Sequence, residues 1–224
     1  MQIYKGIILM GGVGYDCNVY LIDGELIVDT GTGIFFPEMR EEIALMYDIN
    51  NITTIVNTHC HFDHTGGNKK FRDWLKAEIA IHKNDKEALE TGVNTMADAF
   101  GEKARTVTVD KVLKSGDKIK TTNFNFDVIW TPGHTPGSIC LYEKKKKILI
   151  SGDTVFEDGV GRTDFPGSNR DQLYKSLKRL SELPIDYLLP GHGMPKIGGI
   201  NFMIRQSIIL SKENVMLSKE NVLF

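Results

Sequence analysis

The chain has 224 residues, of which 41% are hydrophobic and 25% charged, and its formal net charge is −2. A chain of this size can bury a core without a disulfide or structural metal. The mixed, nearly balanced charges exclude the basic surface of a nucleic-acid binder. We see neither a signal peptide nor an apolar run of about 18 residues that could cross a membrane. Three cysteines, odd in number and widely spaced, favour a reducing compartment, so we expect a cytoplasmic protein.

The first third of the chain predicts strands with one helix between them. Asp23-Gly24 is typical of a hairpin turn, and Pro37 favours the first turn of a helix that runs to about Tyr47. The predicted strands are Ile3–Met10, Asn18–Ile22, Glu25–Asp29 and Ile52–Asn57. The last of them is β-branched, which indicates a buried strand, and it leads directly into a histidine-rich segment.

The rest of the chain repeats this alternation of strands and helices. The predicted helices are Thr65–Leu75, Arg170–Leu180 and one from about Asn201 onward. The predicted strands are Glu78–Ile81, Phe124–Trp130, Ser138–Tyr142, Lys147–Ser151 and Ile185–Leu189. Residues 84–114 are expected to be mainly helical and loop-like. Two strand-rich halves with helices predict two packed sheets with helices outside.

We expect residues 1–224 to form a single domain. Residues 200–224 would be its C-terminal helical tail. This tail contains a near-repeat, SKENVML at Ser211–Leu217 and SKENVLF at Ser218–Phe224. The repeat is typical of an amphipathic helical end, and two copies are too few to indicate a coiled coil.

Five of the six histidines lie in three short segments, each of which follows an apolar strand. They are His59, His61 and His64 in THCHFDHTGG, His134 in TPGHTPGS and His192 in LPGHG. Loops at strand ends hold side chains in fixed directions on a rigid sheet. The sixth histidine, His82, is expected to be an ordinary hydrogen-bonded residue.

These residue types predict a metal site. Imidazole and carboxylate are good ligands for zinc and similar divalent ions. His59 and His61 are two apart in an extended run, so they project to one side and can share an ion, while Cys60 points away. Asp63 and His64 follow at a turn that could aim them toward a second position, and Asp153 could bridge the two.

The order HxHxDH at His59–His64, then His134, Asp153 and His192, resembles the metallo-β-lactamase superfamily. The likeness extends from IVDTG (Ile27–Gly31) to LPGHG. It implies an α+β chain folded as a four-layer αββα sandwich that holds two divalent ions, zinc first, with iron or manganese as alternatives. The resemblance implies a first-metal set of His59, His61 and His134, a second-metal set of Asp63, His64 and His192, and Asp153 as the bridge. It also gives Asp29 a supporting position beneath the site.

Within the superfamily, the stretch Gly152–Asn169 is most similar to the glyoxalase II-like (hydroxyacylglutathione hydrolase-like) single-domain hydrolases. Only 32 residues (224 − 192) follow His192, so the longer glutathione-binding C-terminal domain of the full-length enzymes is expected to be missing. The resemblance implies that a metal-bridging hydroxide, oriented by Asp63 as a catalytic residue, cleaves a small-molecule thioester or ester. The expected substrate contacts are Phe35, Phe36, Arg162 and Phe165, with residues 84–114 forming part of the cleft wall.

Three other functions stay open. A mononuclear iron persulfide dioxygenase of the same fold shares the THCH and GRTDF segments and would use His59, His134 and Asp153. A lactonase is the second alternative. The third is a non-catalytic, metal-stabilised binding module, which would have closed coordination. The hydrolase is favoured because every second-metal ligand is present. We expect no nucleic-acid or membrane partner, and the sequence leaves the oligomeric state open.

Overall fold

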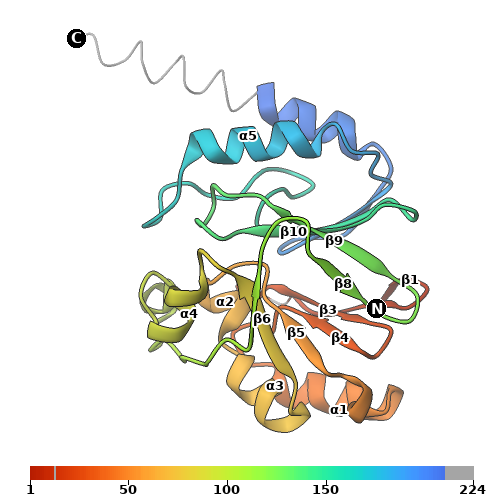
Figure 1. Cartoon of the computed structure of the whole chain (residues 1–224), viewed down its shortest axis with the longest axis vertical. Coiled ribbons are helices and arrows are strands. Elements are labelled where there is room, and N and C mark those ends of the chain that lie inside the picture. Colours follow the sequence, from red (N-terminus) through yellow and green to blue (C-terminus); the bar gives the residue numbers. More distant parts are fainter. Residues whose placement is uncertain (13, 210–224) are drawn as a thin grey trace.

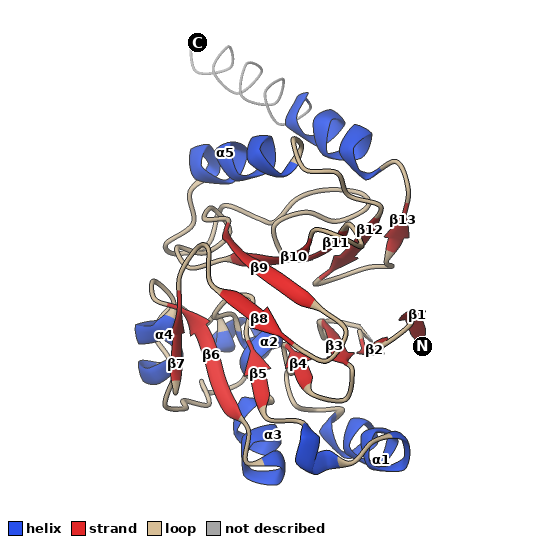
Figure 2. Cartoon of the chain, turned by 45° about the vertical axis from the view of Figure 1, so that its right-hand side comes forward, coloured by secondary structure: helices blue, strands red, loops and turns tan. Residues whose placement is uncertain are grey.

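The computed structural model describes residues 1–12 and 14–209, and its strands form two sheets (Figures 1 and 2). The N-terminal sheet has seven strands in chain order. They are β1 (Gln2–Tyr4), β2 (Ile7–Gly11), β3 (Asn18–Ile22), β4 (Leu26–Val28), β5 (Thr54–Val56), β6 (Glu78–His82) and β7 (Lys111–Leu113). Pairing is antiparallel from β1 to β4 and parallel from β4 to β7.

The C-terminal sheet has six strands in the order β13-β12-β11-β10-β9-β8. They are β8 (Lys118–Lys120), β9 (Asn125–Trp130), β10 (Ile139–Glu143), β11 (Ile148–Gly152), β12 (Tyr187–Pro190) and β13 (Lys196–Ile197). The pairing of β11 with β12 is parallel, and the chain between them crosses over through a helix, as a parallel pair requires.

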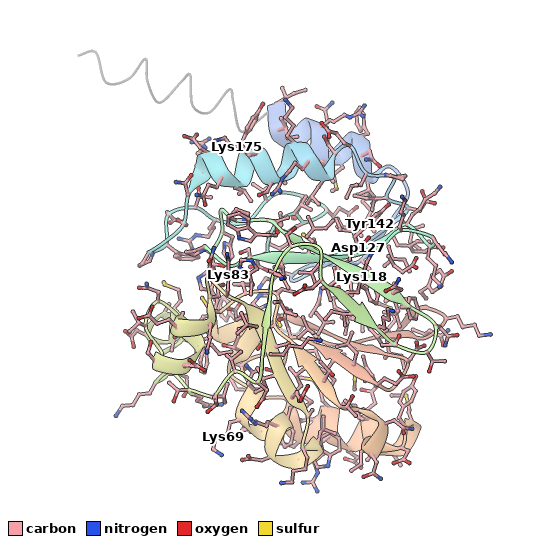
Figure 3. All side chains as sticks on the ribbon, in the orientation of Figure 1. Lys69, Lys83, Lys118, Asp127, Tyr142 and Lys175 are labelled. Carbon is pink, nitrogen blue, oxygen red and sulfur yellow. The ribbon has the colours of Figure 1, made fainter. Side chains whose placement is uncertain are left out.

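Helices cover the outer face of each sheet. The helices are α1 (Phe36–Met46), α2 (Phe62–Thr65), α3 (Asn68–Leu75), α4 (Lys86–Thr91) and α5 (Arg170–Leu180), with two short 3₁₀ turns, η1 (Ile49–Asn51) and η2 (Ala97–Phe100). In Figure 1, α1 and α3 lie under the N-terminal sheet, and α5 and the helix at residues 200–209 lie over the C-terminal sheet. Figure 3 shows Lys69 of α3 and Lys175 of α5 at these two outer surfaces. The expected four-layer αββα sandwich is confirmed.

Successive side chains along each strand point to opposite faces of the sheet, and three apolar layers result. In β3, Tyr20 and Ile22 enter the core between the sheets, while Leu21 between them packs toward α1 and α3. In β11, Ile148 and Ile150 face the same central core, and Leu149 packs toward α5. Side chains of successive strand residues point to opposite faces, so strands buried on both faces are uniformly apolar in sequence.

Two predicted elements are each divided in the structure. The run Ile3–Met10 forms β1 and β2, because Gly6 adopts a φ of 87° and reverses the chain between them. The predicted helix Thr65–Leu75 begins earlier and is interrupted, giving α2 and α3 on either side of Gly66-Gly67. A Cβ at Gly67 would collide with the backbone carbonyl of Thr30, so this glycine lets the chain pass close to the loop after β4.

Three short strands, β7, β8 and β13, were not predicted from the sequence. Each spans two or three residues, which is too short for a periodic pattern. The strand β7 lies inside the segment 84–114, which is otherwise helical or irregular as expected. The near-repeat at 211–224 lies outside the described residues. No described helix is both long and apolar enough to cross a membrane.

Candidate metal centre

The sequence-predicted ligands converge although they come from both sheets. The segment from His59 to His64 follows β5 of the N-terminal sheet. His134 follows β9, Asp153 follows β11, and His192 follows β12, all in the C-terminal sheet. The carboxyl ends of these strands therefore bring four separate segments of the chain to one place, where rigid sheets position them.

His59, His61 and His134 form the first cluster. Their ligand atoms lie within 4.8 Å of one another, and all three residues are buried. Each ring meets the other two edge-on, with centroids 4.5–4.8 Å apart. Three imidazoles in this arrangement can share one ion.

Hydrogen bonds behind the rings fix which nitrogen faces the centre. His134 Nδ1 lies 2.9 Å from the backbone carbonyl of Arg162, which can only accept, so Nδ1 carries the proton. His59 Nδ1 lies 3.1 Å from the Thr58 hydroxyl, which already donates to Asp29 Oδ2, so the ring donates here too. In both rings the lone pair is consequently on Nε2, the nitrogen that faces the cluster.

The Nε2 atoms of His59, His61 and His134 are all buried and have no hydrogen-bond partner among the described residues. Buried polar atoms are almost always paired, because an unpaired one forfeits its hydration. Burial also holds the pKa of His61 down to about 3 and the pKa of His59 well below its usual value, so both rings are neutral at pH 7. Neutral, buried, unpartnered nitrogens on converging rings fit a divalent metal ion.

Asp63, His64 and His192 form the second cluster. His192 Nε2 lies 3.0 Å from Asp63 Oδ2 and 3.3 Å from His64 Nε2. Burial alone would raise the pKa of Asp63, but the neighbouring His64 and His192 lower it, so the carboxylate is ionised. Two imidazoles and a carboxylate are also a suitable donor set for a divalent ion.

Asp153 lies between the two clusters. Its Oδ2 is 3.5 Å from His134 Nε2 of the first cluster and 3.7 Å from His192 Nε2 of the second. Its Oδ1 is 3.2 Å from His64 Nε2. A Cβ at Gly191 would collide with Asp153 Oδ1, so glycine is needed for the loop carrying His192 to approach this carboxylate.

Asp29 supports one histidine of each cluster from beneath. Its Oδ2 lies 2.8 Å from His64 Nδ1 and also accepts the Thr58 hydroxyl, which in turn meets His59. Asp29 itself has a φ of 60°, an uncommon conformation for a residue other than glycine. A buried carboxylate in this position fixes the tautomer of the ring it contacts.

Asp85 is a second buried carboxylate behind the site, and it was not among the residues predicted from the sequence. Its Oδ2 accepts hydrogen bonds from the backbone N–H of Cys60 and the hydroxyl of Thr135, and its Oδ1 accepts one from the N–H of Gly137. These partners flank His59, His61 and His134 in the chain. In the sequence, Asp85 is a single aspartate in the segment Lys83-Asn84-Asp85, and it belongs to no recognisable motif.

A cleft of about 920 Å³ opens over both clusters. Five of the candidate ligands line it, namely His61, Asp63, His134, Asp153 and His192, and segment 84–114 contributes to its wall as expected. Of the four expected substrate contacts, Phe35, Arg162 and Phe165 line this cleft. Phe36 does not line it, because its ring packs against Phe71 and Trp74, 5.0 and 6.0 Å away, in the core under the N-terminal sheet.

Two further residues, His82 and Cys17, could in principle bind a metal but are not part of either cluster. His82 is buried and stacks on Trp130 with ring centroids 5.5 Å apart, so it is the ordinary packed residue expected from the sequence. Cys17 approaches Asp29 and His64, but burial raises the pKa of its thiol to about 12. A thiol that stays protonated is a poor ligand.

A family model described as the metallo-beta-lactamase superfamily matches residues 12–192. The chain belongs to this superfamily. A relative from Methanocaldococcus jannaschii, named "Probable metallo-hydrolase", is 36% identical over 84% of this chain and 92% of its own length. The hydroxyacylglutathione hydrolase GloC of Haemophilus influenzae is 33% identical over 64% of this chain and 69% of its own. Hydrolase-named relatives of this kind support a metal-dependent hydrolase within the metallo-β-lactamase superfamily.

Two further proteins are similar over most of the chain. The acyl-coenzyme A thioesterase MBLAC2 of Gallus gallus is 32% identical over 80% of this chain and 73% of its own. Among solved structures, TTHA1623 in a di-iron-bound form is 28% identical, with a TM-score of 0.71 over 88% of this chain and 96% of that one.

Proposed function

We propose that the protein hydrolyses thioesters, using two divalent metal ions. The observation that carries this proposal is the set of three buried, unpartnered Nε2 atoms beside a second donor cluster. His59, His61 and His134 would hold the first ion. Asp63, His64 and His192 would hold the second, and Asp153 would bridge the two. Zinc is the first candidate, and iron or manganese would suit the same nitrogen and oxygen donors.

A pair of divalent ions supplies a water of low pKa as nucleophile and polarises the carbonyl that is attacked. The residues of the chain hold this chemistry in place. Asp63, whose carboxylate meets His192 and lines the cleft, would accept a proton from the attacking water and orient it. Asp29 keeps His64 in the tautomer that presents Nε2.

A thioester suits this site because a thiolate leaves without being protonated, so the protein needs no general acid. An amide would need one. The hydroxyacylglutathione hydrolase and the acyl-coenzyme A thioesterase, both above 30% identity, act on thioesters according to their names, which supports the same substrate class here. The described cysteines are free and buried, which fits the reducing cytoplasm as the site of action.

The test is metal analysis of the purified protein combined with thioester-hydrolysis and oxygen-uptake assays. We expect close to two ions per chain and release of free thiol from a short acyl thioester, lost on chelation and restored by added metal. Oxygen uptake with a persulfide, together with a single iron that added metal cannot increase, would instead establish the dioxygenase. A full metal complement with neither activity would establish a non-catalytic module.

A further inference from the structure

The cleft over the metal centre has one wall that is apolar and open to solvent. It combines side chains from the loop before α1 with the segment around η2. They are Ile34, Phe35, Met96, Ala99 and Phe100. Ile34 is 62% exposed although it is a large apolar residue. Exposed apolar surface inside a cleft marks a place where a ligand removes that surface from water.

The structure holds this open wall firmly against the metal centre. Phe62, which lies between His61 and Asp63, donates its N–H to the carbonyl of Thr95 over 2.7 Å, and its ring lies 5.8 Å from that of Phe100. Arg105 donates to the carbonyl of Thr32 over 3.0 Å and so ties the segment around η2 to the segment before α1.

Met96 presents its side chain from an uncommon backbone conformation, with a φ of 62°. Residues other than glycine adopt such angles at a cost, and they persist where the surroundings impose them. Methionine is unbranched and polarisable, which lets it fit flexible apolar chains. A methionine held in this conformation on a cleft wall is consistent with contact to an apolar ligand.

The C-terminal half also contributes apolar residues to the lining, namely Phe156, Val160 and Phe165, which we call the opposite wall. The ring of Phe165 packs against His61, with centroids 5.4 Å apart, and is covered by the guanidinium of Arg162 at 4.3 Å. The nearby Val160 pairs with Val155 in an isolated β-bridge. On this side Phe156, Val160 and Phe165 are all partly buried, whereas Ile34 and Ala99 of the open wall are exposed.

Away from the metal centre, the charges around the cleft do not favour an anionic ligand. Outside the proposed metal ligands, two of the described lining residues are acidic, namely Asp16 and Glu102. Arg162 is the one Lys or Arg among the described lining residues, and it forms a two-pronged ion pair with Asp164 at 3.0 and 2.6 Å. The carboxylates of glutathione or the phosphates of coenzyme A would find no unpaired Lys or Arg among these described residues.

We propose that the open wall formed by Ile34, Phe35, Met96, Ala99 and Phe100 binds the acyl part of the substrate, which is an apolar chain. The thiol part then points out of the cleft and is not recognised there. The inference rests on the proposed thioester hydrolysis, and it assigns substrate selection to the acyl side of the scissile bond.

The proposal predicts a dependence of rate on acyl chain length. Each methylene that leaves water for an apolar wall should raise kcat/KM roughly three- to fourfold until the wall is filled. The thiol part should matter little, because charges that remain in solvent contribute weakly.

The experiment compares acetyl, butanoyl, hexanoyl and octanoyl thioesters of N-acetylcysteamine, a small neutral thiol, with the metal-loaded protein. We expect kcat/KM to rise about 100-fold from acetyl to hexanoyl, from four added methylenes. Hexanoyl thioesters of glutathione and coenzyme A should be hydrolysed with kcat/KM within about fivefold of the N-acetylcysteamine ester. A strict requirement for either natural thiol would overturn the proposal.

Two variants locate the effect on the wall. Ile34→Asn changes an exposed side chain and should fold normally, and Phe100→Ala removes the aromatic ring of η2. Both should lower the hexanoyl-to-acetyl ratio of kcat/KM roughly tenfold. Phe202→Ala removes a ring that is 69% exposed outside the cleft and should leave this ratio unchanged. Phe156→Ala tests the opposite wall, and a larger loss of the ratio there than in Phe100→Ala would contradict our choice of wall.

The outcomes separate this inference from the proposed function. If none of the thioesters is hydrolysed by protein carrying its full metal complement, the proposed function fails. If the acetyl ester is hydrolysed but the rate does not increase with chain length, thioester hydrolysis stands and the acyl-binding wall is wrong.

Discussion

The carboxylate of Asp85 accepts a hydrogen bond of 2.6 Å from the hydroxyl of Thr135, the residue after His134. The same oxygen accepts the N–H of Cys60, which lies between His59 and His61. One buried side chain therefore joins the two loops that carry the first cluster, although it contacts none of the three histidines in these bonds. We regard Asp85 as a positioning residue for the first metal ion.

Replacing Asp85 with Asn should weaken metal binding at the first cluster. The amide has one acceptor oxygen, so it cannot accept from Cys60, Thr135 and Gly137 as the carboxylate does. Loss of such a supporting contact typically costs about 10- to 100-fold in metal affinity. Calorimetric titration of metal-depleted protein with zinc should show the weakening in one of two binding steps.

Asp110→Asn is the matched control for this variant. Asp110 also accepts a hydrogen bond from a backbone N–H, that of Ile79, over 2.9 Å, and it forms an ion pair with Arg72. It is not part of the metal centre. Both variants should lose thermal stability. Equal zinc affinities in the Asp85 and Asp110 variants would show that Asp85 has a structural role alone.

Asp153→Ala should damage the metal centre more than Asp63→Ala. Asp153 lies within 3.7 Å of histidines from both clusters, so its removal weakens two coordination spheres. Asp63 contacts His192 and His64 of the second cluster, so its loss should leave one ion at the first. Metal content and turnover are measured for both variants at one metal supply. Retention of both ions by Asp153→Ala, with loss of both by Asp63→Ala, would refute the bridging assignment.

Asp29→Asn should reduce the metal content from two ions toward one. The carboxylate accepts the proton on His64 Nδ1, so Nε2 is the nitrogen that would bind the metal ion. An amide nitrogen in that place would favour the opposite tautomer, with Nε2 protonated and unable to bind. Metal analysis after dialysis checks this, and an unchanged two-ion content would mean that Asp29 does not set the tautomer.

Unfolding free energy should fall as the pH is lowered from about 6.5 to about 4, in part because of His82. Burial, with a smaller contribution from Lys83, lowers the pKa of His82 to about 4, while the unfolded chain takes up the proton near 6.5. The folded state therefore loses stability as the pH falls through this window, and the loss levels off below the folded pKa.

The variant His82→Phe keeps a ring to stack on Trp130 and removes the titrating group. Between pH 6.5 and 4 it should lose about 1–2 kcal/mol less stability than the unmodified protein. Denaturant unfolding of both metal-depleted proteins across this range measures the difference. If the unfolding free energies of the two proteins fall equally between pH 6.5 and 4, His82 does not contribute to the pH dependence.

The sequence predicted the parts of this molecule that have a repeating or local pattern. The buried strand before His59 and the helix after Pro37 follow from β-branched and helical patterns, and the ligand candidates follow from their spacing. Asp85 and Phe100 could not be found this way. The hydrogen-bond partners of Asp85 lie 25 to 52 residues away in the chain, and Phe100 packs against Phe62 of α2. These contacts form only when the chain is folded, so no local sequence pattern reveals them.

The ligand segments belong to different sheets, and this has a consequence for assembly. An ion bound by both His61 of the N-terminal half and His134 of the C-terminal half would cross-link the two sheets. Neither half alone carries a complete first cluster. The first metal ion can therefore bind tightly only after the two sheets have packed together. Binding energy at the ion then becomes folding energy for the whole sandwich, and any sliding of one sheet over the other would have to break coordination.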